Sequence, residues 1–261
     1  MAKATPPQKS SSGLIKITAV SPKELTAKKF IEVLKQFQSP EELKKHQHYF
    51  KFSDEKPLKG DKFIGVRMGQ IFEMGKAFIE MPAKEIEKLM ESDIHEVRVG
   101  AMSIMGKQAA HKKTTEARLK ELYNLYIDRH DRINSWDLVD LAAHHVVGRY
   151  LADKPRAILY KLARSKNTYQ RRTAMLSTAH FIMKQKQTDE AFKIAEILVN
   201  DKEEFVQTSV GWMLRTAGAI DRKGLIAFLN KHAATMPRNA LRASIEHFDK
   251  KEKEKYMGMK K

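Results

Sequence analysis

Apolar residues recur at intervals of three and four from about residue 23 onward, and this spacing constrains the fold more than any other feature of the sequence. Side chains at such intervals lie on one face of an α-helix. One stripe consists of Phe30, Val33, Leu34 and Phe37. Pro, Gly, Asn or Asp interrupts the pattern at intervals of about 10–18 residues. Strand-like alternation is scarce, so the sequence predicts an all-helical protein.

The predicted helices also repeat along the chain. Helix beginnings of similar style start at Asp93, Asn167 and Asp201. A capped helix with small residues, a turn and a second helix is typical of HEAT-like pairs, which bury an apolar face only by stacking on neighbours. We predict an all-α superhelix (α-solenoid) of roughly six pairs with a concave inner groove. With a period of about 35–39 residues, comparable places are taken by Arg98, Asp137, Arg172, Gln207 and Arg242.

Three segments follow from this pattern. Residues 22–248 are predicted to form a single HEAT-like repeat domain. Residues 1–21 are rich in Lys, Ser and Pro and are expected to form a mobile basic arm, and residues 249–261 a charged tail that frays. No apolar run approaches the roughly 18 residues of a membrane span, and the N-terminus lacks the apolar core of a signal peptide. We expect a cytoplasmic protein without membrane contact.

The charge balance indicates the class of partner. Lys and Arg number 49 against 32 Asp and Glu, a net charge of +17, and the chain contains no Cys. Such an excess favours polyanions, nucleic acid first and an anionic membrane surface second. The lack of Cys excludes disulfides, thiolate metal sites and a Cys nucleophile, and it suits a reducing cytoplasm.

Positive charge is concentrated between residues 154 and 172, which include no Asp or Glu. A single Lys usually belongs to a solvated helix face, but seven basic residues without a counter-charge favour a phosphate-binding wall. Such a wall would make the predicted concave groove basic. The residues are Lys154, Arg156, Lys161, Arg164, Lys166, Arg171 and Arg172.

Four residues are candidates for chemistry: Trp136, Asp140, Arg172 and Trp212. Each lies early in the leading helix of its predicted repeat, and stacked repeats bring equivalent positions into a row. Trp136 and Asp140 stand at i and i+4 and therefore share a helix face. An indole and a carboxylate on one face are well suited to a cationic group held close to DNA.

Structural roles compete with these functional ones. Trp212 stands among apolar residues and can belong to the core, and Asp140 can form a structural ion pair with Arg149 or Arg172. Asp137 follows a candidate N-cap, Ser135, where the helix dipole alone explains a carboxylate.

The doublet His144-His145 suggests a metal or acid–base site four residues beyond Asp140. One Asp and two His without a further ligand at a fixed spacing are weak evidence for a metal. No Gly-rich phosphate loop, GxSxG elbow or HExxH motif appears. We therefore predict neither a metal nor a cofactor.

Three stretches together resemble the AlkD-like DNA alkylation-repair glycosylases, a family built from HEAT-like repeats. Trp136-Asp137-Leu138-Val139-Asp140 matches the pattern W-D-x-V-D, Gln170–Ala174 ends as R-x-A, and Glu204–Arg215 is similar to E-F-x-x-Q-K-A-x-G-W-x-L-R. They occur in order and at suitable separations, and the similarity covers nearly the whole chain after the arm. Thr208 replaces a usual Lys and Tyr169 a frequent Trp, departures that concern affinity more than chemistry.

The resemblance implies a monomeric, cofactor-free, monofunctional glycosylase. Its substrates would be cationic N3- and N7-alkylpurines in double-stranded DNA, and the base would not have to be flipped into a tight pocket. Asp140 would be the catalytic carboxylate, Trp136 and Trp212 would contact the damaged nucleotide, and Arg172 would hold the lesion-strand backbone. Tyr49 resembles a tyrosine on the other side of the groove.

Two other functions fit a basic helical repeat. One is a non-catalytic module that binds DNA of unusual structure. The other is a HEAT scaffold whose basic face meets acidic protein partners or RNA. Asp140 and the two Trp residues argue against the first, and the three matching motifs argue against the second.

Overall fold

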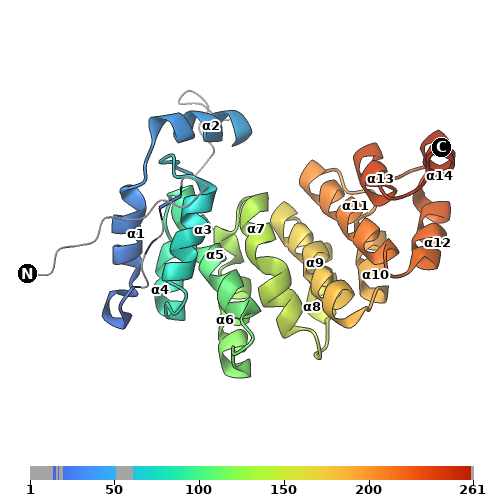
Figure 1. Ribbon diagram of the computed structural model, residues 1–261. Coiled ribbons are helices and arrows are strands. Elements are labelled where there is room, and N and C mark those ends of the chain that lie inside the picture. The colour runs from blue at the N-terminus through green and yellow to red at the C-terminus, as the bar shows by residue number, and fades with distance from the viewer. Residues whose placement is uncertain (1–13, 16, 18–19, 51–60, 260–261) are drawn as a thin grey trace, which may run out of the picture. The chain divides into compact units, whose positions relative to one another are not determined.

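The computed structural model describes residues 14–15, 17, 20–50 and 61–259 (Figure 1). Within these ranges the chain is helical, with fourteen α-helices and one isolated bridge between Lys62 and Ile94. The predicted all-α class is confirmed. Most of the arm expected at residues 1–21 lies outside the described residues. None of the described helices combines the length and the apolar character that crossing a bilayer requires.

The chain forms two compact units, residues 1–132 and 133–261. In the first unit α5 is central: α3, α4 and α6 pack against it, and α1 packs against α3 and α4. Nearly every residue of α5 is buried. The single domain expected over residues 22–248 stays a prediction. The helices of this unit are α1 (Ala27–Lys35), α2 (Pro40–Phe50), α3 (Met68–Ala77), α4 (Ala83–Met90), α5 (His95–Ala110) and α6 (Glu116–Asp128).

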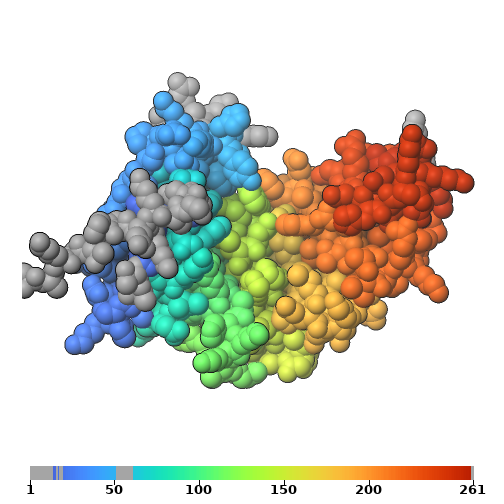
Figure 2. Space-filling view, viewed as in Figure 1, coloured from blue at the N-terminus to red at the C-terminus, as the bar shows by residue number. Residues whose placement is uncertain are grey.

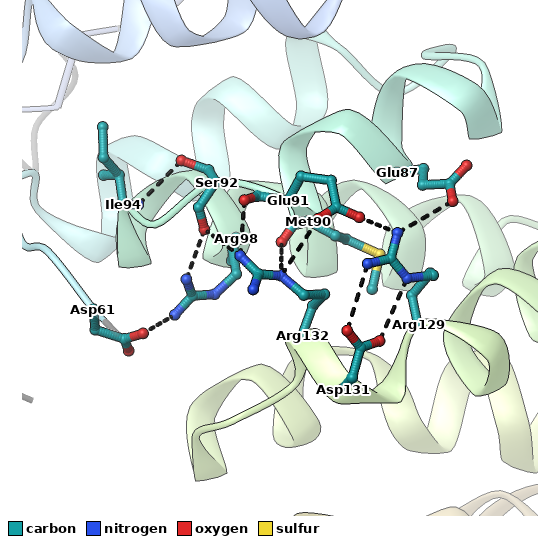
Figure 3. A network of polar contacts seen from close by, with 10 residues as sticks. All are labelled: Asp61, Glu87, Met90, Glu91, Ser92, Ile94, Arg98, Arg129, Asp131 and Arg132. Carbon is teal, nitrogen blue, oxygen red and sulfur yellow. Dashed lines mark hydrogen bonds and ion pairs between the residues drawn. The ribbon is translucent and has the colours of Figure 1, made fainter. Parts of the chain in front are cut away.

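Arginines of the first unit fasten the turn between α4 and α5 (Figure 3). Arg98 and Arg132 both donate to the backbone carbonyl of Ser92, at 2.7 and 3.3 Å, and Arg98 also pairs with the carboxylate of Asp61. Arg129, at the end of α6, pairs with three carboxylates around it. Because the Arg98 side chain is buried, these bonds satisfy a charge that would be costly to leave unpaired. These basic residues are therefore structural.

His130 gives the first unit a predicted pH dependence. Its ring is buried with an edge-on contact to Tyr126, and burial lowers the pKa of His130 to about 4. Below pH 6.5 the unfolded chain takes up a proton that the folded state accepts only near pH 4. Stability is therefore complete above pH 6.5 and falls between pH 6.5 and 4, by roughly 3 kcal/mol. In His130→Gln the loss of stability at acid pH should be smaller than in wild type. Hydrogen exchange of α6 measures it, and the control His111→Gln, at an exposed position, should lose as much stability as wild type.

The second unit is built from successive helix pairs in two layers. The leading helices α7, α9, α11 and α13 lie side by side, and the trailing helices α8, α10 and α12 form the other layer (Figure 1). A π-helical turn continues α7 and another continues α9. The elements are α7 (Trp136–Ala143), η3 (His144–Gly148), α8 (Ala157–Ala163), α9 (Thr168–His180), η4 (Phe181–Gln185), α10 (Asp189–Leu198), α11 (Glu204–Gly218), α12 (Arg222–His232), α13 (Arg238–Ser244) and α14 (Lys250–Gly258).

Two glycines allow the leading helices to approach closely. A Cβ at Gly148 would lie 2.3 Å from the backbone oxygen of Ser177 on α9, and one at Gly211 would lie 2.6 Å from that of Ala240 on α13. Either substitution would push neighbouring helices apart. Side chains fill the spaces between the ribbons of α10 to α14 (Figure 2). This packing fixes the positions of the residues on η3 and on the middle of α11.

The C-terminal segment differs from its expected frayed form. Residues 250–258 form α14, whose N-cap Asp249 accepts a hydrogen bond from the backbone of Glu252 at 2.8 Å. Tyr256 is only 2 % exposed, and its ring meets that of Phe248 at 5.8 Å. The many charged residues of this segment led to the expectation of a frayed tail, although it contains a tyrosine that packs against the preceding residues.

Candidate active site

Asp140 and Arg172 form a two-pronged ion pair between α7 and α9. Nε and Nη2 of Arg172 donate to the two carboxylate oxygens of Asp140 at 2.8 and 2.7 Å, and Nη1 donates to the backbone carbonyl of Phe205 on α11. The Arg172 side chain is 3 % exposed, whereas that of Asp140 keeps 22 %. One buried guanidinium thus connects three leading helices and holds a carboxylate whose outer side reaches the surface.

Two opposing effects act on the Asp140 carboxyl. Burial raises the pKa of Asp140 above its ordinary value, and the nearby charge of Asp137 acts in the same direction. Arg172 opposes both, because it hydrogen-bonds and attracts the ionised form. A negative charge held in partly dry surroundings interacts more strongly with a nearby cation than it would in water.

Asp140 and Trp212 line the same half-open pocket of about 240 Å³. Trp212 on α11 is 43 % exposed, so the core role considered for it does not apply. The pocket therefore combines a carboxylate, a histidine, an indole and an apolar floor within the second unit. Its lining residues are Asp140, His144, Leu176, Ala179, Met183, Trp212, Met213 and Thr216.

Trp136 is not among these lining residues and belongs to an aromatic pair beside them. Its ring stacks on that of Phe205, with centroids 6.3 Å apart and planes 22° apart. Phe205 is exposed, and its backbone carbonyl receives the third hydrogen bond of Arg172. Phe205 lies within the motif Glu204–Arg215 but is not among the candidate residues that the sequence indicates. The available signal was an aromatic residue in the first turn of a leading helix.

Two arginines of the basic segment are held inside the second unit. Arg171 donates to both carboxylate oxygens of Asp201, at 2.6 and 3.1 Å. Arg156 faces Glu190 at 3.5 Å and lies over the ring of Phe181. These carboxylates come about 30 residues later in the chain, so a count of the charges within the basic segment does not include them.

The remaining members of that segment differ in their surroundings. Lys154 pairs with Asp153 at 3.0 Å and lies over the Tyr150 ring. The predicted phosphate-binding wall stays a prediction. Three residues of the segment are exposed and could contact a phosphate group. They are Lys161, Arg164 and Lys166.

Tyr49 lies near the end of α2 in the first unit and is exposed, with its ring edge-on to that of Phe50. Its predicted place opposite the other site residues stays a prediction.

Across the described ranges, no cluster of three or more His, Cys, Asp or Glu side chains could hold a metal ion. The rings of His144 and His145 nevertheless lie close together, with centroids 3.6 Å apart.

The structure defines the class of the protein. It is a helical-repeat protein with a partly exposed anionic site, in which a carboxylate held by an arginine lines a pocket together with an indole. The chain matches the family model described as DNA alkylation repair enzyme over residues 30–248, and it belongs to that family.

A solved structure described as a predicted DNA alkylation repair enzyme from Enterococcus faecalis is similar, with a TM-score of 0.61 and 17 % identity. The similarity covers 82 % of this chain and 97 % of that one, and at such identity it shows the fold alone. No curated protein matches the chain.

Proposed function

We propose that this protein is a monofunctional DNA glycosylase that hydrolyses the N-glycosidic bond of cationic N3- and N7-alkylpurines in double-stranded DNA. The observation that carries the proposal is the partly exposed Asp140 carboxylate on the wall of a pocket shared with Trp212. Membership of the alkylation repair family supports the same chemistry.

The proposed reaction uses the charge that the lesion already carries. Alkylation at N3 or N7 makes the purine cationic and hence a good leaving group. Breaking the glycosidic bond builds oxocarbenium character on the deoxyribose, and a carboxylate placed against the sugar stabilises that developing charge. Asp140, fixed by Arg172 and partly desolvated, is the residue proposed for this role.

Aromatic faces would hold the cationic nucleotide. An indole attracts a cation by about 0.5–2 kcal/mol, depending on how far the pair is desolvated. Trp212 offers such a face in the pocket, and Trp136 stacked on Phe205 offers another beside it. Because the pocket is half-open, it suits contact with a lesion better than enclosure of a fully flipped base.

The basic residues divide between positioning and backbone contact. All three nitrogens of the buried Arg172 guanidinium have partners, so we propose that it positions Asp140 rather than reaching a phosphate. Exposed Lys161 and Lys166 are the better candidates for phosphate contacts, which would make DNA affinity depend on salt.

The test is base release from duplex DNA treated with a methylating agent, measured by mass spectrometry. The wild-type protein should release cationic 7-methylguanine and 3-methyladenine, and it should leave uncharged O6-methylguanine in the same DNA. Release of neutral and cationic bases at similar rates would contradict the electrostatic basis of the proposal.

Two other outcomes would point elsewhere. No base release together with tight binding to branched DNA would favour the non-catalytic module. A DNA affinity too weak to measure near physiological salt would favour the scaffold for acidic partners.

A further inference from the structure

His144 lies in the candidate active site and has no part in the function proposed above. It is four residues beyond Asp140, at the start of η3, and both side chains line the same pocket. The other lining residues are apolar side chains, an indole and a threonine. Among the lining residues, His144 is therefore the only titratable group besides Asp140.

The clamp on Asp140 limits what that carboxylate can do. Each of its oxygens accepts a hydrogen bond from Arg172. Such an arrangement favours the ionised form, which stabilises a developing cation. Transfer of a proton to Asp140 would give up part of this interaction with a buried guanidinium. A second group in the pocket is better placed to receive the proton that hydrolysis releases.

We propose that a ring nitrogen of His144 accepts a proton from the attacking water. This inference rests on the proposed glycosylase activity. In the reaction the C1′–N bond breaks and its electron pair leaves with the cationic purine, which becomes neutral. The water oxygen forms a bond to C1′, and the water proton passes to His144 and then to solvent. Asp140 stays ionised throughout and stabilises the sugar cation.

The surroundings of His144 suit a proton acceptor. Burial lowers the pKa of His144, and the positive charge of Lys184 acts in the same direction, as does His180 when it is protonated. Burial also lowers the pKa of His180, to about 4, so that ring is neutral at pH 7. Among the described residues, the ring nitrogens have no hydrogen-bond partner, which leaves them available to water. A π-helical turn at this point is a feature often found at functional sites.

Charged and titratable groups approach His144 from several elements. They are Asp140 on α7, His145 on η3, His180 on α9 and Lys184 on η4. Arg149, the C-cap of η3, acts electrostatically on His180. The residues that α11 adds to the lining are not titratable. Apart from Asp140, these neighbours are basic, and a positive charge disfavours protonation of the ring.

The experiment is single-turnover release of 7-methylguanine from a defined duplex between pH 5 and 8. His144→Gln should lower the rate at pH 7 roughly 10²-fold, the lower limit for a lost proton acceptor. The wild-type rate should fall at acid pH with a midpoint below 6.5, and the variant should lose this limb. Added imidazole should restore part of the activity of His144→Ala. His145→Gln is the matched control, because its ring lies against that of His144 and does not line the pocket.

The outcomes separate this inference from the proposed function. If wild type releases the base and His144→Gln keeps its rate and pH profile, the inference fails and the glycosylase stands. A wild-type protein that releases no base overturns both. If His144→Gln does not fold, His144→Asn and imidazole rescue of His144→Ala decide the question, since a purely structural histidine would give a pH-independent loss without rescue.

Discussion

Asp140→Asn is expected to reduce the rate of 7-methylguanine release by about 10²- to 10³-fold, the usual loss when one preorganised electrostatic partner of a transition state is removed. Asparagine keeps the shape of the side chain and one hydrogen bond to Arg172, but it carries no negative charge for the developing oxocarbenium ion. Binding of the lesion-containing duplex should change little, because the neutral amide removes a stabiliser of the transition state rather than a DNA contact.

The second unit supplies a matched control for this substitution. Asp201 accepts the same two-pronged interaction from Arg171, one residue before Arg172, and it lies outside the pocket. Asp201→Asn should therefore disturb packing to a similar degree and leave base release near the wild-type rate. Rates come from single-turnover assays and affinities from fluorescence anisotropy. Equal rates for Asp140→Asn and Asp201→Asn would make Asp140 a structural carboxylate and remove the catalytic assignment.

The ion pairs Asp140–Arg172 and Asp201–Arg171 illustrate which features of the site can be predicted from the sequence. Apolar spacing predicts helices, and the small-residue and capping patterns predict pairs with a fixed period. Together they place Trp136, Asp140, Arg172 and Trp212 on leading helices, as the structure has them. The i, i+4 relation of Trp136 and Asp140 needs only helix geometry. Features that follow from local periodicity were therefore predictable.

Features that depend on lateral packing were not predictable in the same way. The counter-charges of Arg156 and Arg171 come from later helices, so a local count made these residues appear unpaired. Phe205 and Met183 join the site through the contact of α11 and η4 with their neighbours, which no local pattern encodes. Likewise, α14 is held by the buried ring of Tyr256 and by hydrogen bonds from Arg222 and Arg238, which lie on earlier helices.

Arg172→Leu is expected to have the second large effect, on both stability and rate. It removes the hydrogen bonds to Asp140 and to the Phe205 carbonyl. Breaking a buried ion pair by deleting one partner usually costs about 3–5 kcal/mol, and the partial exposure of Asp140 places this pair near the lower value. Denaturant unfolding followed by the fluorescence of Trp136 and Trp212 reports on the second unit, which contains both.

The rate of Arg172→Leu should also depend on pH in a new way. Without the guanidinium, nothing opposes the effect of burial on Asp140, so the pKa of that carboxyl rises further. The carboxylate is then protonated at a higher pH, so the rate of the variant relative to wild type should be lowest at acid pH and partly recover as the pH increases. Arg171→Leu loses a comparable pair outside the pocket and should be destabilised without this pH-dependent defect. A loss of rate that is the same for both variants at every pH would mean that Arg172 supports only the fold, because positioning a reactive carboxylate requires the pH dependence to change.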